Sequence, residues 1–274
     1  MNKVLITGAA GFIGSQLSRR LMDRGLTVKG LDNFNEHLYT PRLKRDRMVH
    51  FDLDIWGCDL KDEIKVEALL REFQPDTIVH LAAMAGVRDS LGKEKSYHAN
   101  NIDATQNLID TCKKHLPDTR IVYASTSCIY AGAPVPWVEG REHGKQLNAY
   151  GYTKWANECQ MQSSGLDTVG LRFFTVYGPW GRPDMALFDF TKNILDEQEI
   201  TVYNYGDMKR DFGGPTLLAE GVVRDTDGNP IERATIDSWH TAPMSCGFWN
   251  GTPAQGAKPV VCCHQNHIIC CRQC

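Results

Sequence analysis

The chain has 274 residues, of which 42% are hydrophobic and 23% charged, so it is long enough to bury a sizeable core and too apolar to be disordered. Its formal net charge of −3 supplies no overall attraction to nucleic acid or to an anionic membrane, so we expect neither as a partner. The first residues lack the unbroken apolar run of a secretory signal, and no apolar stretch approaches the ~18 residues of a membrane span, which predicts a cytoplasmic protein.

Residues 3–173 alternate short β-branched runs with longer helical patterns, which is typical of successive βαβ units. The first helix is expected from about residue 12 to residue 24, with Ile13, Leu17 and Leu21 on one face and Gly25 at its end. The short apolar runs predict strands buried on both faces of a parallel sheet, at residues 4–6, 27–31, 77–81, 121–124 and 168–173. The predicted fold class is therefore α/β, with a doubly wound, Rossmann-like sheet.

A glycine-rich turn, TGAAGFIG at residues 7–14, joins the first expected strand to the first expected helix. Because Gly8, Gly11 and Gly14 carry no side chains, the backbone can turn tightly and its N–H groups can approach a phosphate, to which the helix N-terminus adds partial positive charge. The alternative is a glycine-rich surface turn. The flanking strand, helix and downstream acid favour instead a site for the pyrophosphate of a dinucleotide.

The downstream acid is Asp32, at the end of the second expected strand, where a carboxylate accepts hydrogen bonds from the ribose hydroxyls of adenosine. Because a carboxylate repels a 2′-phosphate, NAD is favoured over NADP, although Lys29, Arg42 and Lys44 lie near enough in sequence to keep NADP open. Asp59 is a second candidate, for the adenine edge. A helix N-cap or a solvated loop acid is an equally good interpretation of Asp59.

Tyr150 and Lys154 are four residues apart on an expected helix, so they project from one face. Such a pair alone is usually surface decoration, but this one follows Ser125, Thr126 and Ser127 at the carboxyl edge of the sheet, where such folds place ligands. A phenol acts as a base at neutral pH only if its pKa of about 10 falls by ~3 units, which takes about 4 kcal/mol. Lys154 and a positive nicotinamide ring would supply this, making Tyr150 the general acid/base and Thr126 the hydroxyl that holds the substrate oxygen.

Together with LDNFN, HLAAMAGVRDS, the Ser-Thr-Ser segment and YGYTK, these motifs resemble the extended short-chain dehydrogenases/reductases, specifically the NAD-dependent nucleotide-sugar 4-epimerases, over residues 4–212. The segment VYNYGDMKRDF looks most like UDP-glucuronate 4-epimerases. The resemblance implies transient oxidation at C4, NAD as cofactor, a small-molecule nucleotide sugar as substrate, and a homodimer. Related dehydratases and decarboxylases carry an acid at the position of Ser127, so a serine there favours plain epimerisation.

The same resemblance implies roles for individual residues. The implied catalytic residues are Thr126, Tyr150 and Lys154. The implied cofactor-binding residues are Gly8, Gly11, Phe12, Gly14, Asp32, Asp59, Leu60, Leu81, Ala82, Ala83, Asn101, Tyr150 and Lys154, with Asn101 supporting the backbone of the site. The implied substrate-binding residues are Arg88, Ser127, Thr175 and Arg182. Both arginines suit a pyrophosphate or a uronate carboxylate, unless they are ordinary surface charges. His80, at an apolar strand end, is expected to be structural.

The sequence changes character after residue 212. Residues 213–242 read as two β-rich runs around an Asp-Gly-Asn-Pro turn and resemble a strand pair of intradiol catechol dioxygenases, where the epimerase family has the rest of its substrate lid. The iron of those dioxygenases needs two tyrosines, and no tyrosine follows Tyr205, so no iron site is expected. Residues 243–274 are expected to be a disordered tail whose cysteines are too closely spaced for a usual zinc module, so no metal is assigned.

Three interpretations remain open for the whole chain. The leading one is an NAD-dependent nucleotide-sugar 4-epimerase core at residues 1–212 that converts UDP-glucuronate to UDP-galacturonate. The alternative is a protein that binds NAD but is catalytically silent, because its substrate lid is incomplete. A fusion or frameshift product whose tail has no selected role is the third.

Overall fold

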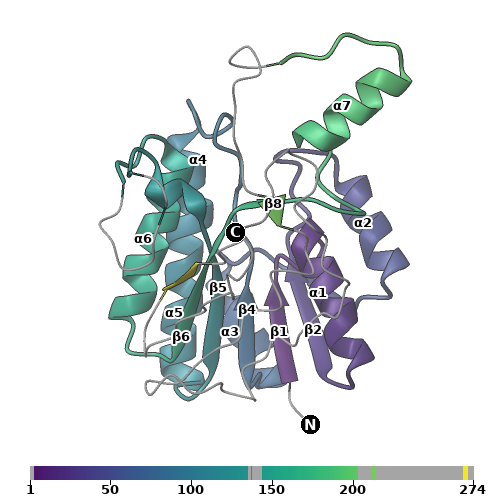
Figure 1. The fold of residues 1–274 in the computed structure, drawn as a ribbon. Coiled ribbons are helices and arrows are strands. Elements are labelled where there is room, and N and C mark those ends of the chain that lie inside the picture. Colours follow the sequence, from purple (N-terminus) through teal and green to yellow (C-terminus); the bar gives the residue numbers. More distant parts are fainter. Residues whose placement is uncertain (1–2, 135–136, 138–143, 203–211, 214–267, 271–274) are drawn as a thin grey trace, which may run out of the picture.

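The computed structural model describes residues 3–134, 137, 144–202, 212–213 and 268–270 (Figure 1). Its centre is a seven-stranded parallel sheet in the order β3-β2-β1-β4-β5-β6-β9. The strand order proceeds outward in opposite directions from the neighbours β1 and β4, as in a doubly wound sheet, which confirms the predicted fold class. The strands of this sheet are β1 (Lys3–Thr7), β2 (Thr27–Asp32), β3 (Ile55–Gly57), β4 (Thr77–His80), β5 (Arg120–Thr126), β6 (Thr168–Phe173) and β9 (Ile268–Cys270).

Helices cover both faces of this sheet (Figure 1). Leu5 of β1 packs with residues of α3, α5 and α6 on one face, whereas its neighbours Val4 and Ile6 pack with α1 on the other. This alternation within one strand is the geometry of a sheet buried on both sides. The helices are α1 (Phe12–Asp23), α2 (Pro41–His50), α3 (Glu63–Phe73), α4 (Glu94–Tyr97), the π-helix η1 (His98–Asp103), α5 (Ala104–His115), the 3₁₀-helix η2 (Ser127–Tyr130), α6 (Ala149–Ser163) and α7 (Ala186–Leu195).

The expected first helix is confirmed to within a residue at its C-terminal end. Leu17 and Leu21 of α1 are buried against the sheet, Arg24 is the C-cap, and Gly25 follows with a φ of +79°. Only a residue without a Cβ adopts that left-handed conformation without strain, so the glycine ends the helix.

All five predicted strands are present, and the structure adds short ones. Strand β3 contains only Ile55, Trp56 and Gly57, which is too short to show a pattern in the sequence. A separate two-stranded parallel sheet pairs β7 (Thr175–Val176) with β8 (Phe212–Gly213). None of the helices in the described residues is long and apolar enough to span a bilayer.

The end of the chain is described only in part. Residues 214–267 and 271–274 lie outside the described residues, and so do the hairpin expected at residues 213–242, apart from Gly213, and most of the cysteine-rich tail. Within that tail Ile268–Cys270 forms strand β9 beside β6, which the sequence did not predict.

Candidate active site

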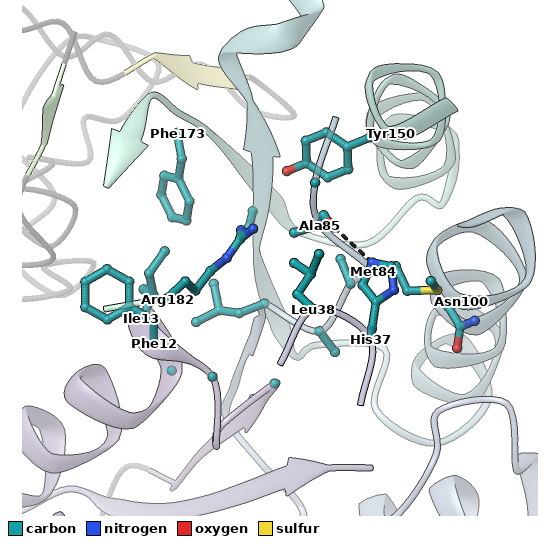
Figure 2. Close-up of a pocket in the computed structure, with 18 of the residues that line it drawn as sticks. Phe12, Ile13, His37, Leu38, Met84, Ala85, Asn100, Tyr150, Phe173 and Arg182 are labelled. Atoms are coloured by element: carbon teal, nitrogen blue, oxygen red, sulfur yellow. Dashed lines mark hydrogen bonds between the residues drawn. The ribbon is translucent and has the colours of Figure 1, made fainter. Parts of the chain in front are cut away.

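A pocket with a volume of about 410 Å³ lies at the carboxyl end of the parallel strands (Figure 2). Its walls come from the glycine-rich turn, the segments that follow β2, β4 and β5, the start of α6, and the chain from Phe173 to Met185. All of the residues predicted for the site line this pocket except Arg88 and Asn101. The carboxyl edge of a doubly wound sheet is where such folds bind ligands.

The glycine-rich turn is closed by its own backbone. The N–H of Gly8 donates to the carbonyl of Leu31 at 2.7 Å, and the N–H of Gly11 donates to the carbonyl of Gly8 at 3.0 Å. Gly8 has a φ of +72°, and a Cβ on Gly14 would collide with the Gly8 carbonyl oxygen. The turn therefore needs glycine at both positions, and it presents the N-terminus of α1 to the pocket, where an anion is favoured.

Asp32 is fixed at the rim of the pocket. Its carboxylate accepts hydrogen bonds from the backbone N–H groups of Ala10 at 3.1 Å and of Phe34 at 2.8 Å. The ammonium of Lys44 lies 3.7 Å from Asp32 Oδ1, and burial lowers the pKa of Lys44. A cation therefore does adjoin the carboxylate, as the sequence allowed, and it comes from the first turns of α2.

Asp59 also lines the pocket. Its carboxylate accepts hydrogen bonds from Asn33 Nδ2 at 3.0 Å and from the backbone N–H of Lys61 at 2.9 Å. The N-cap of α3 is Asp62, which accepts from the backbone N–H of Lys65 at 3.2 Å. The interpretation of Asp59 as a helix cap is therefore wrong, and its place beside the pocket keeps it as a candidate for contact with the cofactor.

Tyr150 and Lys154 both line the pocket from α6. Asn148 is the N-cap of this helix, and its Oδ1 accepts a hydrogen bond from the N–H of Gly151 at 2.8 Å. Burial raises the pKa of Tyr150 to about 12, against the opposing influence of the Thr126 hydroxyl. The sequence argument predicted a lowered pKa for this phenol when the nicotinamide ring is bound, and in the protein by itself burial acts in the opposite direction. That argument relied on two cations, and one of them, the nicotinamide ring, belongs to the cofactor.

Lys154 is 2% exposed, and burial lowers its pKa to about 8, although Glu158 acts in the opposite direction. Lys154 also lines the pocket. A largely buried lysine that lines a pocket fits a ligand that brings hydroxyl groups, as the ribose of a dinucleotide does. The chain thus contains a donor set that suits the predicted cofactor.

This burial predicts that Lys154→Met stabilises the fold. A pKa lowered from 10.5 to about 8 corresponds to a cost of roughly 3 kcal/mol when the group is charged in both the folded and the unfolded chain. The cost is fully present below pH 8 and disappears as the pH rises above 10.5. We expect the free energy of unfolding of Lys154→Met in urea to exceed that of the parent at pH 7, with a gain that shrinks as the pH rises.

The matched control is Lys65→Met, at an ammonium whose side chain is 70% exposed beside Asp62. We expect the loss of this exposed pair to leave the free energy of unfolding nearly unchanged at every pH. If the free energy of unfolding of Lys154→Met at pH 7 equals or falls below that of the parent, the claim that the buried charge of Lys154 destabilises the fold is contradicted.

The other side of the pocket carries Arg182. Figure 2 shows its side chain extending into the middle of the pocket, and the phenol of Tyr150 pointing to the same space from α6. Arg182 Nε donates to Asp184 Oδ1 at 3.0 Å, which fixes the guanidinium on one side. Ser127 and Thr175 line the same pocket.

Asn101 and Arg88 are the two predicted site residues that do not line the pocket. Asn101 is fully buried in η1, where its side chain accepts from the N–H of Met84 at 2.7 Å and donates to the Met84 carbonyl at 3.0 Å and to Thr153 Oγ1 at 2.9 Å. Its amide supports the wall of the pocket and has no group left to contact a ligand. Arg88 follows the lining residues Gly86 and Val87 but does not line the pocket itself.

His80 is structural, as predicted. Its ring nitrogens lie 2.8 Å from Thr7 Oγ1 and 3.0 Å from Thr105 Oγ1, and burial lowers its pKa to about 3. The sequence reasoning missed other residues of the pocket, among them His37, Tyr39 and Asn35. Their signal was their place directly after β2, because the loop that follows a strand of such a sheet faces the ligand site.

The chain matches known proteins over most of its length. The sequence model of the NAD dependent epimerase/dehydratase family matches residues 4–224, past the expected boundary at 212. UDP-glucuronate 4-epimerase 1 of Arabidopsis thaliana is 43% identical over 237 residues, which cover 82% of this chain and 55% of that protein. Protein CapI of Staphylococcus aureus is 40% identical over 230 residues, which cover 81% of this chain and 68% of that protein.

Solved structures show the same likeness. The UDP-glucuronic acid 4-epimerase from Bacillus cereus, in complex with UDP-glucuronic acid and NAD, superposes with a TM-score of 0.72 at 34% sequence identity, covering 78% of this chain and 70% of that one. The chain spans little more than half the length of the Arabidopsis relative. The chain belongs to the NAD dependent epimerase/dehydratase family, and its cofactor is NAD, as the sequence predicted.

Proposed function

We propose that the protein is a nucleotide-sugar 4-epimerase that interconverts UDP-glucuronate and UDP-galacturonate. The observation that carries this proposal is the convergence of Tyr150, Thr126 and Arg182 in one pocket with the glycine-rich turn and Lys154. The UDP-glucuronate 4-epimerases among its relatives, one solved with UDP-glucuronic acid and NAD, support the same substrate.

The residues that would hold NAD are the turn with Gly8, Gly11 and Gly14 for the pyrophosphate, Asp32 for a ribose, and Lys154. When bound, NAD would supply the hydride acceptor for C4 of the sugar and, once reduced, the hydride donor to the opposite face of that carbon. The implied contacts of Phe12, Asp59, Leu60, Leu81, Ala82 and Ala83 stay predictions that their place in the pocket supports.

The chain's own residues would handle the proton and the substrate. Tyr150 takes the proton of the C4 hydroxyl, while the Thr126 hydroxyl, which lines the same pocket, keeps the sugar oxygen in line. The charge of Lys154 stabilises the phenolate, and because Lys154 is buried, solvent screens this attraction little. Arg182, with Ser127 and Thr175, offers a cation and hydroxyls to the uronate carboxylate.

A second candidate is an NAD-binding protein without catalytic activity. Purified protein incubated with UDP-glucuronate and analysed by anion-exchange chromatography separates the two functions. We expect UDP-galacturonate to form until equilibrium, and no conversion of UDP-glucose at the same concentration. Protein that carries NAD but forms no UDP-galacturonate would establish the silent binder.

A further inference from the structure

Arg47, on α2, is a buried cation that the proposed chemistry does not use. Its side chain is fully buried, yet among the described residues it forms no ion pair with an acid. Nε and Nη2 donate to the carbonyl of Trp180 at 3.0 and 2.7 Å, and Nη2 also donates to the carbonyl of Gly181 at 3.1 Å. Nη1 donates to the carbonyl of Ala10 at 3.3 Å and to the hydroxyl of Tyr39 at 2.8 Å. All of the N–H groups of the guanidinium therefore donate to uncharged oxygens.

These oxygens belong to the two halves of the site. Ala10 lies in the glycine-rich turn, and its own N–H is held by Asp32, so this contact is on the cofactor side. Trp180 and Gly181 directly precede Arg182, so their contacts are on the substrate side. The planar guanidinium therefore acts as a bridge between the dinucleotide turn and the loop that carries the substrate cation.

Further contacts hold the same loop. Trp180 has a φ of +61°, which is strained for a residue with a side chain, and its ring lies 4.6 Å from the ring of His50 at the end of α2. Gln16 Nε2 of α1 donates to the carbonyl of Pro179 at 2.8 Å. Consecutive carbonyls at residues 179–181 are thus fixed by α1 and α2 immediately before Arg182.

We propose that Arg47 is a positioning residue that sets the place of the Arg182 guanidinium relative to the cofactor turn, and so the affinity for the substrate. This inference rests on the proposed function. A lysine cannot replace Arg47, because a single ammonium has three donors at one point and cannot reach the carbonyls of two segments and the Tyr39 hydroxyl together. A misplacement on the order of 1 Å in a positioned group can cost about a hundredfold in rate.

The test compares Arg47→Lys with the parent in the full chain. We expect KM for UDP-glucuronate to rise about tenfold or more with a smaller change in kcat, the content of bound NAD to stay the same, and hydrogen exchange to accelerate in the peptide that contains residues 178–182. Arg182→Met should raise KM as well. The double variant should be no worse than Arg182→Met alone, because Arg47 acts through Arg182.

Arg42→Lys is the matched control, since Arg42 is on the same helix with its side chain 88% exposed, and it should change none of these values. His50→Ala removes, at an exposed position, the ring that packs on Trp180, and it should raise KM several-fold. If Arg47→Lys does not fold, this variant tests whether fixing the loop before Arg182 sets the affinity for the substrate. An unchanged KM in a variant that folds, unchanged exchange in the 178–182 peptide, or additive effects in the double variant would overturn the positioning role. If the parent itself neither binds nor converts UDP-glucuronate, the proposed function fails, and the exchange measurement still shows whether Arg47 anchors the loop.

Discussion

Tyr150→Phe is expected to lower kcat for epimerisation by about 10²- to 10⁴-fold while leaving the fold and the bound NAD unchanged. The phenol faces Thr126 in the buried pocket, and the substitution removes only the hydroxyl that exchanges the proton. Burial raises the pKa of Tyr150 to about 12, so without further positive charge the phenol stays protonated at neutral pH. Product formation, far-UV circular dichroism and NAD content after denaturation are the measurements.

The matched control for this variant is Tyr152→Phe, two residues along α6, because Tyr152 is 45% exposed. It should retain the parent rate. A Tyr150→Phe protein whose kcat stays within tenfold of the parent would rule out the phenol as the acid/base, and the role would have to pass to another group of the pocket.

Glu158→Gln is expected to lower the free energy of unfolding by about 3 to 5 kcal/mol. Glu158 forms a buried ion pair with Arg172, with nitrogen to oxygen distances of 2.9 and 2.8 Å, and both side chains are 2% exposed. The Ser125 hydroxyl donates to the same carboxylate, directly before Thr126 on β5. Glutamine keeps the shape but leaves the guanidinium buried without its counter-charge. Urea denaturation at pH 7 measures the loss.

Two further variants distinguish the effect of an unpaired buried charge from the effect of a changed side-chain shape. Asp167→Asn interrupts the exposed pair with Arg120, 2.7 Å apart, and should cost less than about 1 kcal/mol. The double variant Glu158→Leu with Arg172→Met replaces the whole pair by apolar side chains and should recover much of the stability. A loss below 1 kcal/mol in Glu158→Gln, or no recovery in the double variant, would contradict this interpretation.

The fold and the cofactor turn could be predicted because their signals are local. The five predicted strands are short apolar runs, and the turn at Gly8 and Gly14 excludes a Cβ for reasons of backbone geometry alone. Tyr150 and Lys154 could be placed on one face because helical spacing fixes neighbours four residues apart. These features need no knowledge of distant partners.

Features that depend on distant contacts could not be predicted in this way. Arg47 contacts residues more than a hundred positions away, and nothing in KRDRM distinguishes it from its exposed neighbours. The partners of Asn101, Met84 and Thr153, could not be identified from its neighbours in the sequence, although the resemblance implied that Asn101 supports the backbone of the site. The raised pKa of Tyr150 in the protein by itself could not be predicted either, because the cost of burial depends on the packed structure.

The most direct measurement of oxidation and return at C4 is the fate of deuterium placed on that carbon of UDP-glucuronate. The full chain with its bound NAD would be incubated with the labelled substrate in ordinary water, and the UDP-galacturonate examined by mass spectrometry and proton NMR. We expect product that keeps the deuterium on C4, without accumulation of free NADH. Product that has lost the deuterium to solvent, or no product from protein fully loaded with NAD, would contradict 4-epimerisation in this pocket.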